Sequence, residues 1–147
     1  MALERALVMH IEEQDDWGEA ATSSTLAQTY QDLDRMDDAL RSLGRALEIW
    51  EQRGDQRNVG RVLNEYGSAY LALGTTDRAI EVLDQALAIH IALDNWHGEA
   101  VAHEKMGIAL ELIGEASSAA EHWHQAIELY NRVGDPQAED VRRRLLQ

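Results

Sequence analysis

Residues 55–94 read DQRNVGRVLNEYGSAYLALGTTDRAIEVLDQALAIHIALD, and this stretch decides the fold. Apolar residues recur at helical spacing over Val59–Leu73 and again over Ala79–Leu93, which predicts two helices. The Gly-Thr-Thr break at residues 74–76 predicts a tight turn between them. The stretch is therefore expected to form a helical hairpin.

The same pattern returns 40 residues earlier and 40 residues later without a gap. Matching positions include Leu26, Tyr66 and Met106 in the first helix, and Ala39, Ala79 and Ala119 in the second. Self-similarity at a fixed period indicates a stacked array of hairpins. We therefore expect one all-α array over 1–147, with repeats at 15–54, 55–94 and 95–134. Residues 1–14 match the second helix of an incomplete repeat, and 135–147 match the opening of a further first helix.

The expected helix ends carry stop and start residues. Gly54 and Gly134 follow helices and suit the left-handed C-cap conformation. Gly74 and Gly114 mark the turn inside a hairpin, and Asp34 replaces them in the first repeat. Expected N-caps are Asp15, Asp55, Asn95 and Asp135, with Pro136 as the first helical residue after the last of them.

Small residues alternate with large ones along the repeats. Ala39, Ala79, Ala119, Gly67 and Gly107 are expected where two helix backbones approach closely. Larger residues, among them Leu43, Leu83 and Trp123, are expected to fill the space beside them. Trp50 is predicted to lie in the core as well.

These residues resemble the tetratricopeptide repeat, whose pattern is W-x2-L-G-x2-Y followed by A-x3-F. One copy is Leu63, Tyr66, Gly67, Tyr70, Ala79, Leu83 and Ala86; a second is Ser23, Leu26, Ala27, Tyr30, Ala39, Leu43 and Ala46; a third is His103, Met106, Gly107, Leu110, Ala119, Trp123 and Ala126. The resemblance implies an α-solenoid of about 8 helices. The repeat here is 40 residues long, whereas the usual unit has about 34.

The longer form resembles arrays in signalling scaffolds and in bacterial regulators that carry a nucleotide-binding switch domain and a DNA-binding domain. The resemblance implies a non-catalytic module that binds a peptide or partner domain, in a cytoplasmic bacterial protein of transcription regulation. In the family, the first helices line a concave groove. The matching residues here are Ala21, Ser24, Gln28, Arg61, Asn64, Glu65, Ser68, Val101, Glu104, Lys105, Ile108 and Arg144. The alternative is that they form a solvated face without a partner.

One subset of the family clamps a terminal carboxylate with a Lys and an Asn in the first repeat. Ser24 and Gln28 stand at those positions, so the resemblance implies that this clamp is absent. Asn64 keeps a side-chain amide that suits the backbone of an extended peptide.

Composition narrows the classes of partner. The net charge is -14, and only one of the 13 basic residues is a lysine, Lys105. This charge argues against direct nucleic-acid binding and disfavours anionic membranes. No apolar run approaches the roughly 20 residues of a membrane span. Cysteine is absent, which excludes disulfides and thiolate chemistry and fits a cytoplasmic protein.

No catalytic motif, cofactor site or metal site is expected. No G-x-S-x-G, phosphate loop or His-Glu-x-x-His occurs. His122 and His124 are two apart and diverge on a helix, and His10 and His90 share a stacking position with Trp50. Histidines are therefore read as structural or surface groups rather than metal ligands.

Two exposed features leave alternatives open. Trp17 and Trp96, near the starts of first helices, are interpreted as staples between adjacent repeats, with partner anchors as the alternative. The apolar side of residues 1–13, formed by Leu3, Leu7 and Ile11, lacks its usual partner helix. We expect either a fragment of a longer protein or a homo-oligomer that associates through the repeat ends. An autoinhibitory sensor domain is a further alternative.

Overall fold

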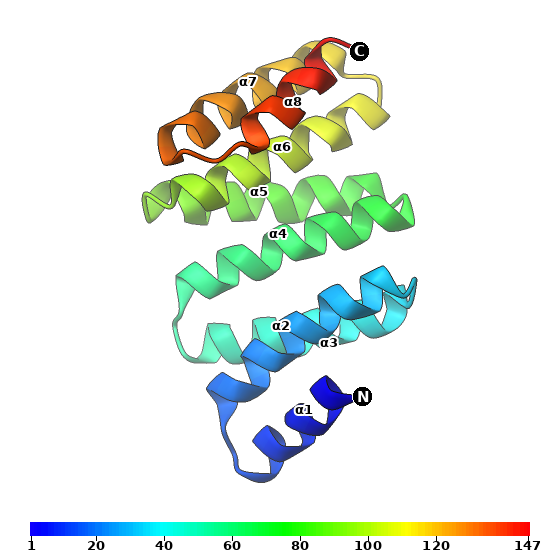
Figure 1. Ribbon diagram of the computed structural model, residues 1–147, viewed down its shortest axis with the longest axis vertical. Coiled ribbons are helices and arrows are strands. Elements are labelled where there is room, and N and C mark those ends of the chain that lie inside the picture. The colour runs from blue at the N-terminus through cyan, green and yellow to red at the C-terminus, as the bar shows by residue number, and fades with distance from the viewer.

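The computed structural model describes all residues, 1–147, as eight α-helices without strands. The helices are α1 (Ala2–Glu12), α2 (Asp16–Asp32), α3 (Met36–Gln52), α4 (Gln56–Leu73), α5 (Thr76–Ala92), α6 (Trp96–Leu112), α7 (Ala116–Val133) and α8 (Gln137–Leu145). They follow one another along the long axis of the molecule, from α1 at one end to α8 at the other (Figure 1). The predicted all-α class and number of helices are confirmed.

Turn and cap residues adopt the conformations that the sequence predicts. Gly54, Gly74, Gly114 and Gly134 have φ angles between 68° and 85°, which glycine adopts without steric cost. Asp34 stands in for glycine with a φ of 58°. Each of these left-handed residues ends a helix and turns the chain back, so the hairpin turns stay short.

The helix starts are capped by side chains. Asp15, Asp55 and Asn95 each accept a hydrogen bond from the backbone N–H three residues further on. Asp135 accepts from the backbone N–H of Gln137 at 2.9 Å. Helix α8 therefore begins at Gln137, one residue later than predicted, and Pro136 lies in the preceding turn.

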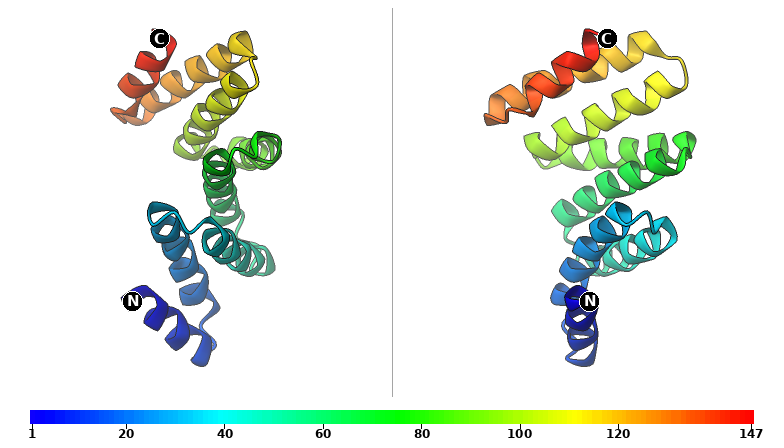
Figure 2. Two further views of the ribbon diagram at one scale, coloured as in Figure 1. Left: turned by 90° about the vertical axis from the view of Figure 1, so that its right-hand side faces the viewer. Right: turned by 45° about the vertical axis from the view of Figure 1, so that its right-hand side comes forward.

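The stack bows because its first helices pack together more closely than its second helices. α2 contacts α4, and α4 contacts α6, in addition to the contacts within each hairpin. The second helices α3, α5 and α7 make few contacts with one another. Viewed from the side in Figure 2, both termini lie on the same side of the stack. The first helices therefore form the inner face.

Two glycines let the helices of a hairpin close tightly. A Cβ atom on Gly67 would lie 2.6 Å from Leu83 Cδ2, and one on Gly107 would overlap the indole of Trp123. The glycines thus make room for a side chain of the paired helix. The prediction that they let two backbones approach is corrected in this respect.

The core is continuous over α2–α6, with smaller clusters at either end of the stack. Burying a side chain of the size of Leu stabilises the fold by about 1.5–3 kcal/mol. The residues predicted to fill the core are buried: Ala39, Leu43, Trp50, Ala79, Leu83, Ala119 and Trp123.

The first helix is only partly unpartnered. Leu3 and Leu7 of this apolar side pack against a cluster that contains Leu26 and Tyr30 of the following helix α2. Ile11 remains 51% exposed. No helix combines the length and the hydropathy that a membrane span needs.

Candidate functional site

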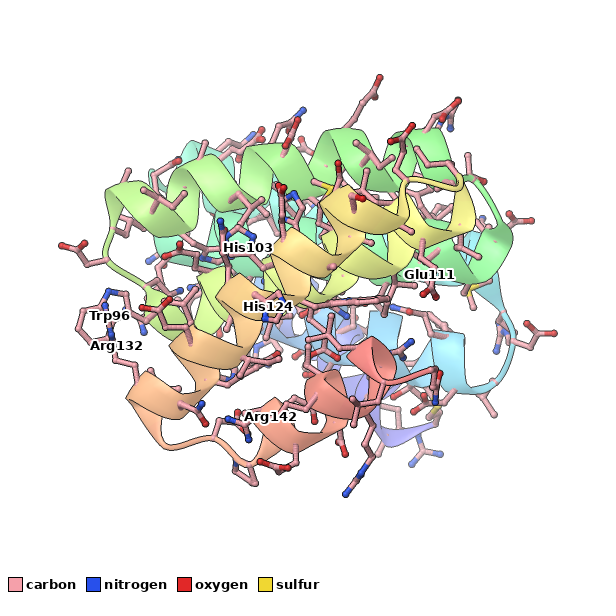
Figure 3. All side chains as sticks on the ribbon, turned by 90° about the horizontal axis from the view of Figure 1, so that it is seen from above. Trp96, His103, Glu111, His124, Arg132 and Arg142 are labelled. Carbon is pink, nitrogen blue, oxygen red and sulfur yellow. The ribbon has the colours of Figure 1, made fainter.

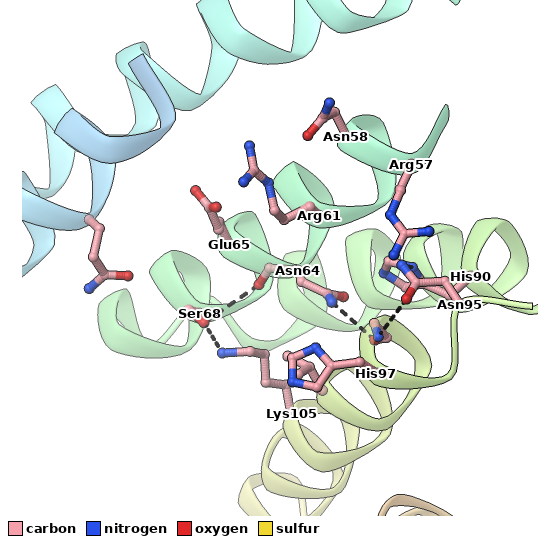
Figure 4. A pocket seen from close by; sticks show the side chains of 13 residues that line it. Arg57, Asn58, Arg61, Asn64, Glu65, Ser68, His90, Asn95, His97 and Lys105 are labelled. Carbon is pink, nitrogen blue, oxygen red and sulfur yellow. Dashed lines mark hydrogen bonds between the residues drawn. The ribbon is translucent and has the colours of Figure 1, made fainter. Parts of the chain in front are cut away.

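Five polar side chains lie along one face of α4, namely Arg57, Arg61, Asn64, Glu65 and Ser68. Residues three and four positions apart are neighbours on a helix surface, so this spacing aligns the five in a single row. Figure 4 shows Asn64 and Ser68 directed toward α6, and Arg61 and Glu65 directed away from it. The face belongs to the inner side of the stack.

Helix α6 supplies the opposite wall, with His90 of α5 and Gln28 of α2 at the edges. The walls enclose a cavity of about 440 Å³, which we call the α4–α6 pocket. Only one lining residue, Val101, is hydrophobic. The lining consists of Gln28, Arg57, Asn58, Arg61, Asn64, Glu65, Ser68, His90, Asn95, His97, Gly98, Val101 and Lys105.

Asn64 is the most deeply buried polar group of this wall, at 6% exposed. Its Nδ2 donates to the backbone oxygen of Gly98 at 3.1 Å, which ties α4 to α6. Its Oδ1 is buried and accepts no hydrogen bond. A buried acceptor without a donor costs about 1–3 kcal/mol. The amide therefore keeps one unused acceptor at the pocket.

A hydrogen-bonded pair closes the pocket behind Asn64. Asn95 Oδ1 accepts from the backbone N–H of Gly98, which orients the amide so that its Nδ2 lies 3.1 Å from His90 Nδ1. His90 Nδ1 is then the acceptor, and the proton of the neutral ring belongs on Nε2. Burial lowers the pKa of His90, which favours this neutral ring.

Glu65 is half-buried beside the cations and forms no hydrogen bond through Oε2. Burial raises the pKa of its carboxyl from 4.5 to about 7, against the opposing effect of Arg61 and Lys105. Burial also lowers the pKa of Lys105, whose Nζ donates to Ser68 Oγ. Glu65 therefore changes charge near neutral pH.

The pocket collects positive charge in a chain whose net charge is -14. Arg57, Arg61 and Lys105 form no ion pair within 4.0 Å, and Glu65 is the only carboxyl in the lining. Of the ten arginines outside the pocket, six pair with carboxylates, namely Arg35, Arg41, Arg45, Arg132, Arg142 and Arg143, and four form no ion pair, namely Arg5, Arg53, Arg78 and Arg144. The unpaired cations of the pocket are thus free to meet an anionic group.

Seven of the twelve residues predicted to face the groove line the pocket, and the other five lie elsewhere. Gln28, Arg61, Asn64, Glu65, Ser68, Val101 and Lys105 line it. Glu104 and Arg144 line a second hollow of about 370 Å³, together with Gln137, Asp140, Arg143 and Gln147. Ser24 is buried in α2, and Ile108 packs against the core cluster of α7 and α8.

Glu104 has structural partners in this second hollow, which we call the α6–α8 hollow. It accepts from Tyr130 Oη at 2.7 Å and from Gln137 Nε2 at 3.0 Å. Burial and the bond to Glu104 raise the pKa of Tyr130. Glu104 therefore joins α6, α7 and α8 and has little capacity left for a partner.

Sequence reasoning missed several lining residues at the helix starts. Arg57 and His97 lie four residues before Arg61 and Val101, on the same helix face. Helical spacing alone could have added both to the predicted groove. Asn95 was recognised only as a cap and His90 only as a stacking position.

Two other histidines, His103 and His122, lie side by side. His103 Nδ1 lies 2.8 Å from His122 Nδ1, and burial lowers the pKa of His103 to about 4. No group of three or more His, Asp or Glu residues is placed to hold a metal ion. The pair therefore joins α6 to α7 as neutral rings (His103 is labelled in Figure 3).

The two exposed tryptophans cover the second helix of their own hairpin. Trp17 meets Trp50 edge-on at 6.3 Å between ring centroids. The guanidinium of Arg132 lies 4.8 Å from the ring centroid of Trp96, and Figure 3 shows these two side chains together at one edge. They brace their hairpins, and these contacts lie within a repeat rather than between adjacent repeats.

Comparisons with known proteins place this geometry in a wider group. A family model described as tetratricopeptide repeat matches residues 18–92 and 58–133. The apo form of RapI is similar in structure, with a TM-score of 0.84 and 18% identity over 95% of this chain and 39% of the RapI chain. The tetratricopeptide-repeat domain of Arabidopsis FLU has a TM-score of 0.74 and 16% identity, covering 80% of this chain and 98% of that domain. The chain thus spans well under half of RapI, and at these identities the likeness concerns the fold alone. A search of curated proteins found no match.

Proposed function

Because the chain belongs to the tetratricopeptide-repeat family, we propose that it is a non-catalytic interaction module that binds a peptide or partner domain at the α4–α6 pocket. Members of this family generally act as protein-interaction scaffolds. The observation that carries the proposal is the row of unpaired polar groups on α4, which face a cavity on the inner side of the stack.

The pocket suits an extended segment of protein. Its lining offers arginine and lysine donors together with the free acceptor Asn64 Oδ1. A peptide backbone presents N–H donors and C=O acceptors at regular intervals, so both kinds of group find partners. No bulky apolar anchor is needed, because the lining is almost wholly polar.

We place the module in a cytoplasmic regulatory protein of bacteria, as the 40-residue repeat form and the near-absence of lysine suggest. A second function has an observation of its own. Val8, Met9 and Ile11 on α1 are all more than half exposed, and such apolar groups favour self-association through the end of the stack. In that case the pocket would have no partner.

A peptide selection separates the two functions. Displayed random peptides are selected on the full chain, and the enriched ones are measured against the double variant Arg61→Ala, Asn64→Ala. The matched control is Arg53→Ala, Asn131→Ala, two exposed positions outside the pocket. We expect the pocket variant to lose at least about tenfold in affinity, since it removes a charged and a neutral hydrogen-bonding group. The control variant should bind as the wild type does.

Light scattering of the same proteins over a range of concentration tests the alternative. If no peptide is enriched while the chain associates, and Ile11→Lys abolishes the association, the structural function replaces the proposed one. Peptides that bind both double variants equally would place the binding surface elsewhere.

A further inference from the structure

The α4–α6 pocket holds an unbalanced set of charges. Three cations, Arg57, Arg61 and Lys105, face one carboxyl, Glu65, and no ion pair within 4.0 Å joins any of them. Between them Asn64 Oδ1 is buried without a donor. A ligand that completes the site must therefore bring negative charge for the cations and an N–H group for Asn64.

Other chemistries fit poorly. A basic segment would bring like charge against three cations at short range, which is unfavourable in a partly buried site. An apolar side chain would take the guanidinium groups and Asn64 Oδ1 out of water without giving them partners. A neutral polar side chain would satisfy Asn64 but would leave the cations unmatched.

A carboxylate meets the geometry of α4. Arg57 and Arg61 are exposed residues one turn apart on α4, so their long side chains can both reach one acidic group, although their guanidinium groups point in different directions in Figure 4. Guanidinium groups bind carboxylates through two parallel hydrogen bonds, which are stronger than neutral ones. The backbone N–H of an acidic residue is close to its carboxylate and can reach Asn64.

Glu65, when ionised, repels the carboxylate of this ligand. The groups that face it are Arg61, Asn64 and Ser68 on its own helix, Lys105 on α6, Gln28 on α2 and, further off, His90 on α5. Its Oε2 accepts nothing from them. The carboxylate of the ligand would make the ionised form of Glu65 less favourable, and protonation of Glu65 removes this repulsion.

We infer that the pocket takes an acidic side chain of the bound segment and that Glu65 carries a proton while it does. This rests on the proposed function, because it names the residue type that the partner presents. The protonated Glu65 then adds an O–H donor to the cations that surround the ligand. The charge balance is simple: the ligand brings one negative charge, and Glu65 loses one by taking a proton from water.

The pH dependence follows from linkage. Burial already raises the pKa of Glu65 to about 7 in the free chain, and an anion beside it raises the pKa further. Below this value Glu65 is neutral in both states, and affinity for the acidic segment does not depend on its proton. Above it, binding takes up a proton, so affinity falls by up to about tenfold per pH unit.

Three oriented peptide pools test the inference on the full chain. The blocked peptides have nine residues, randomised except for a central Glu, Gln or phosphoserine, and are immobilised for interferometry. At pH 6 we expect the Glu pool to bind about tenfold more tightly than the Gln pool, the ratio for about 1.4 kcal/mol. The ratio should shrink at pH 8. In Glu65→Gln it should stay at its pH 6 value, and in Arg61→Ala it should approach one.

The outcomes separate the inference from the function on which it rests. Equal binding of the Glu and Gln pools overturns the acidic ligand but leaves peptide binding in place. A phosphoserine pool that outbinds the Glu pool replaces the carboxylate by a phosphoryl group. The same fall with pH in wild type and Glu65→Gln overturns the role of Glu65. If no pool binds at any pH, both the inference and the proposed function fail. Circular dichroism checks that each variant folds.

Discussion

The α4–α6 pocket and the α6–α8 hollow occupy equivalent places one repeat apart, yet their polar side chains have different hydrogen-bond and ion-pair partners. In the hollow, Glu104 accepts from Tyr130 and from Gln137, and Arg143 pairs with Asp140. In the pocket, whose volume is similar, the carboxyl and the cations have no ion partners. The two sites differ in charge balance, because two carboxyls and two arginines line the hollow, whereas three cations and one carboxyl line the pocket.

Three repeat positions account for much of this difference. Each is occupied by one residue in the pocket and by another, 40 residues later, in the hollow. The pairs are His97 and Gln137, Asn64 and Glu104, and His90 and Tyr130. In the hollow the three side chains bond to one another, whereas in the pocket Asn64 and His90 bond to Gly98 and Asn95 instead.

The largest contrast in stability is expected at the third of these positions, which is His90 in the pocket and Tyr130 in the hollow. Tyr130→Ala should destabilise the chain by about 3–5 kcal/mol, since it empties a large buried site and removes a donor from Glu104. His90→Ala should cost about 2 kcal/mol, because the ring is smaller and has fewer partners. Urea unfolding followed by circular dichroism measures both. Equal costs would contradict the contrast between pocket and hollow.

Replacing the carboxyl of Glu65 or that of Glu104 by an amide should change the free energy of unfolding in opposite directions. The pKa of Glu65 is about 7 in the folded chain and 4.5 without burial, so the folded state binds more protons between these values. Stability from this group therefore falls as pH rises from 4.5 to 7 and then stays level. Glu65→Gln should raise the free energy of unfolding at pH 8 by about 2–3 kcal/mol. At pH 4 the variant and the wild type should be alike.

Glu104→Gln is the matched change in the hollow. It should lower the free energy of unfolding at pH 8 by about 1–2 kcal/mol, because hydrogen bonds to a charged acceptor are replaced by weaker ones. Urea titrations at pH 4, 6 and 8 give both profiles. A stabilising Glu104→Gln would show that its partners do not compensate its charge.

The hairpin array could be predicted from sequence, since its causes are local. Period 40 marks the repeats, Gly54 and Gly134 mark helix ends, and Asp15 and Asp55 mark helix starts. The glycines and the caps each act on the backbone within a few residues of their own position. The side-chain contacts of Gly67 and Gly107 needed the structure, because composition does not tell which atom of the paired helix comes closest.

The sequence predicted which helix face carries the site, but not how deeply its residues are buried. The family resemblance implied that Arg61, Asn64, Glu65 and Ser68 face the groove, and the pocket contains all of them. The depth of burial depends on how one hairpin tilts on the next, which no periodicity encodes. For this reason the bonds that occupy Glu104 were not foreseen.

Helix caps at the pocket and at the hollow should stabilise the chain by similar amounts. Asp55 caps α4 at the pocket, and Asp135 accepts the Gln137 N–H at the start of α8 in the hollow. Replacing either by Ala should cost about 1 kcal/mol in urea unfolding. Glu115→Ala is the control, because Glu115 precedes α7 without a side-chain cap bond and should cost little. A much larger cost for Asp55→Ala alone would indicate that the pocket depends on its cap.

The smallest change in stability is expected when the chemistry of the hollow is transferred to the pocket. The triple variant combines His97→Gln, Asn64→Glu and His90→Tyr. A tyrosine ring has space at position 90, since Gly60 and Gly98 flank it where Ala100 and Ala138 flank Tyr130. New bonds between the introduced side chains should offset the lost Asn64–Gly98 bond, leaving the free energy of unfolding within about 1 kcal/mol of wild type.

Binding should change far more than stability in this triple variant. The carboxylate introduced at position 64 meets Arg57, Arg61 and Lys105 from within the chain and competes with the acidic ligand for them. The preference for the Glu pool over the Gln pool should fall to about one, since the cations no longer lack a partner. A triple variant that keeps the preference would mean that the acidic side chain binds outside the α4–α6 pocket. Unmatched charge at these positions would then have no bearing on recognition.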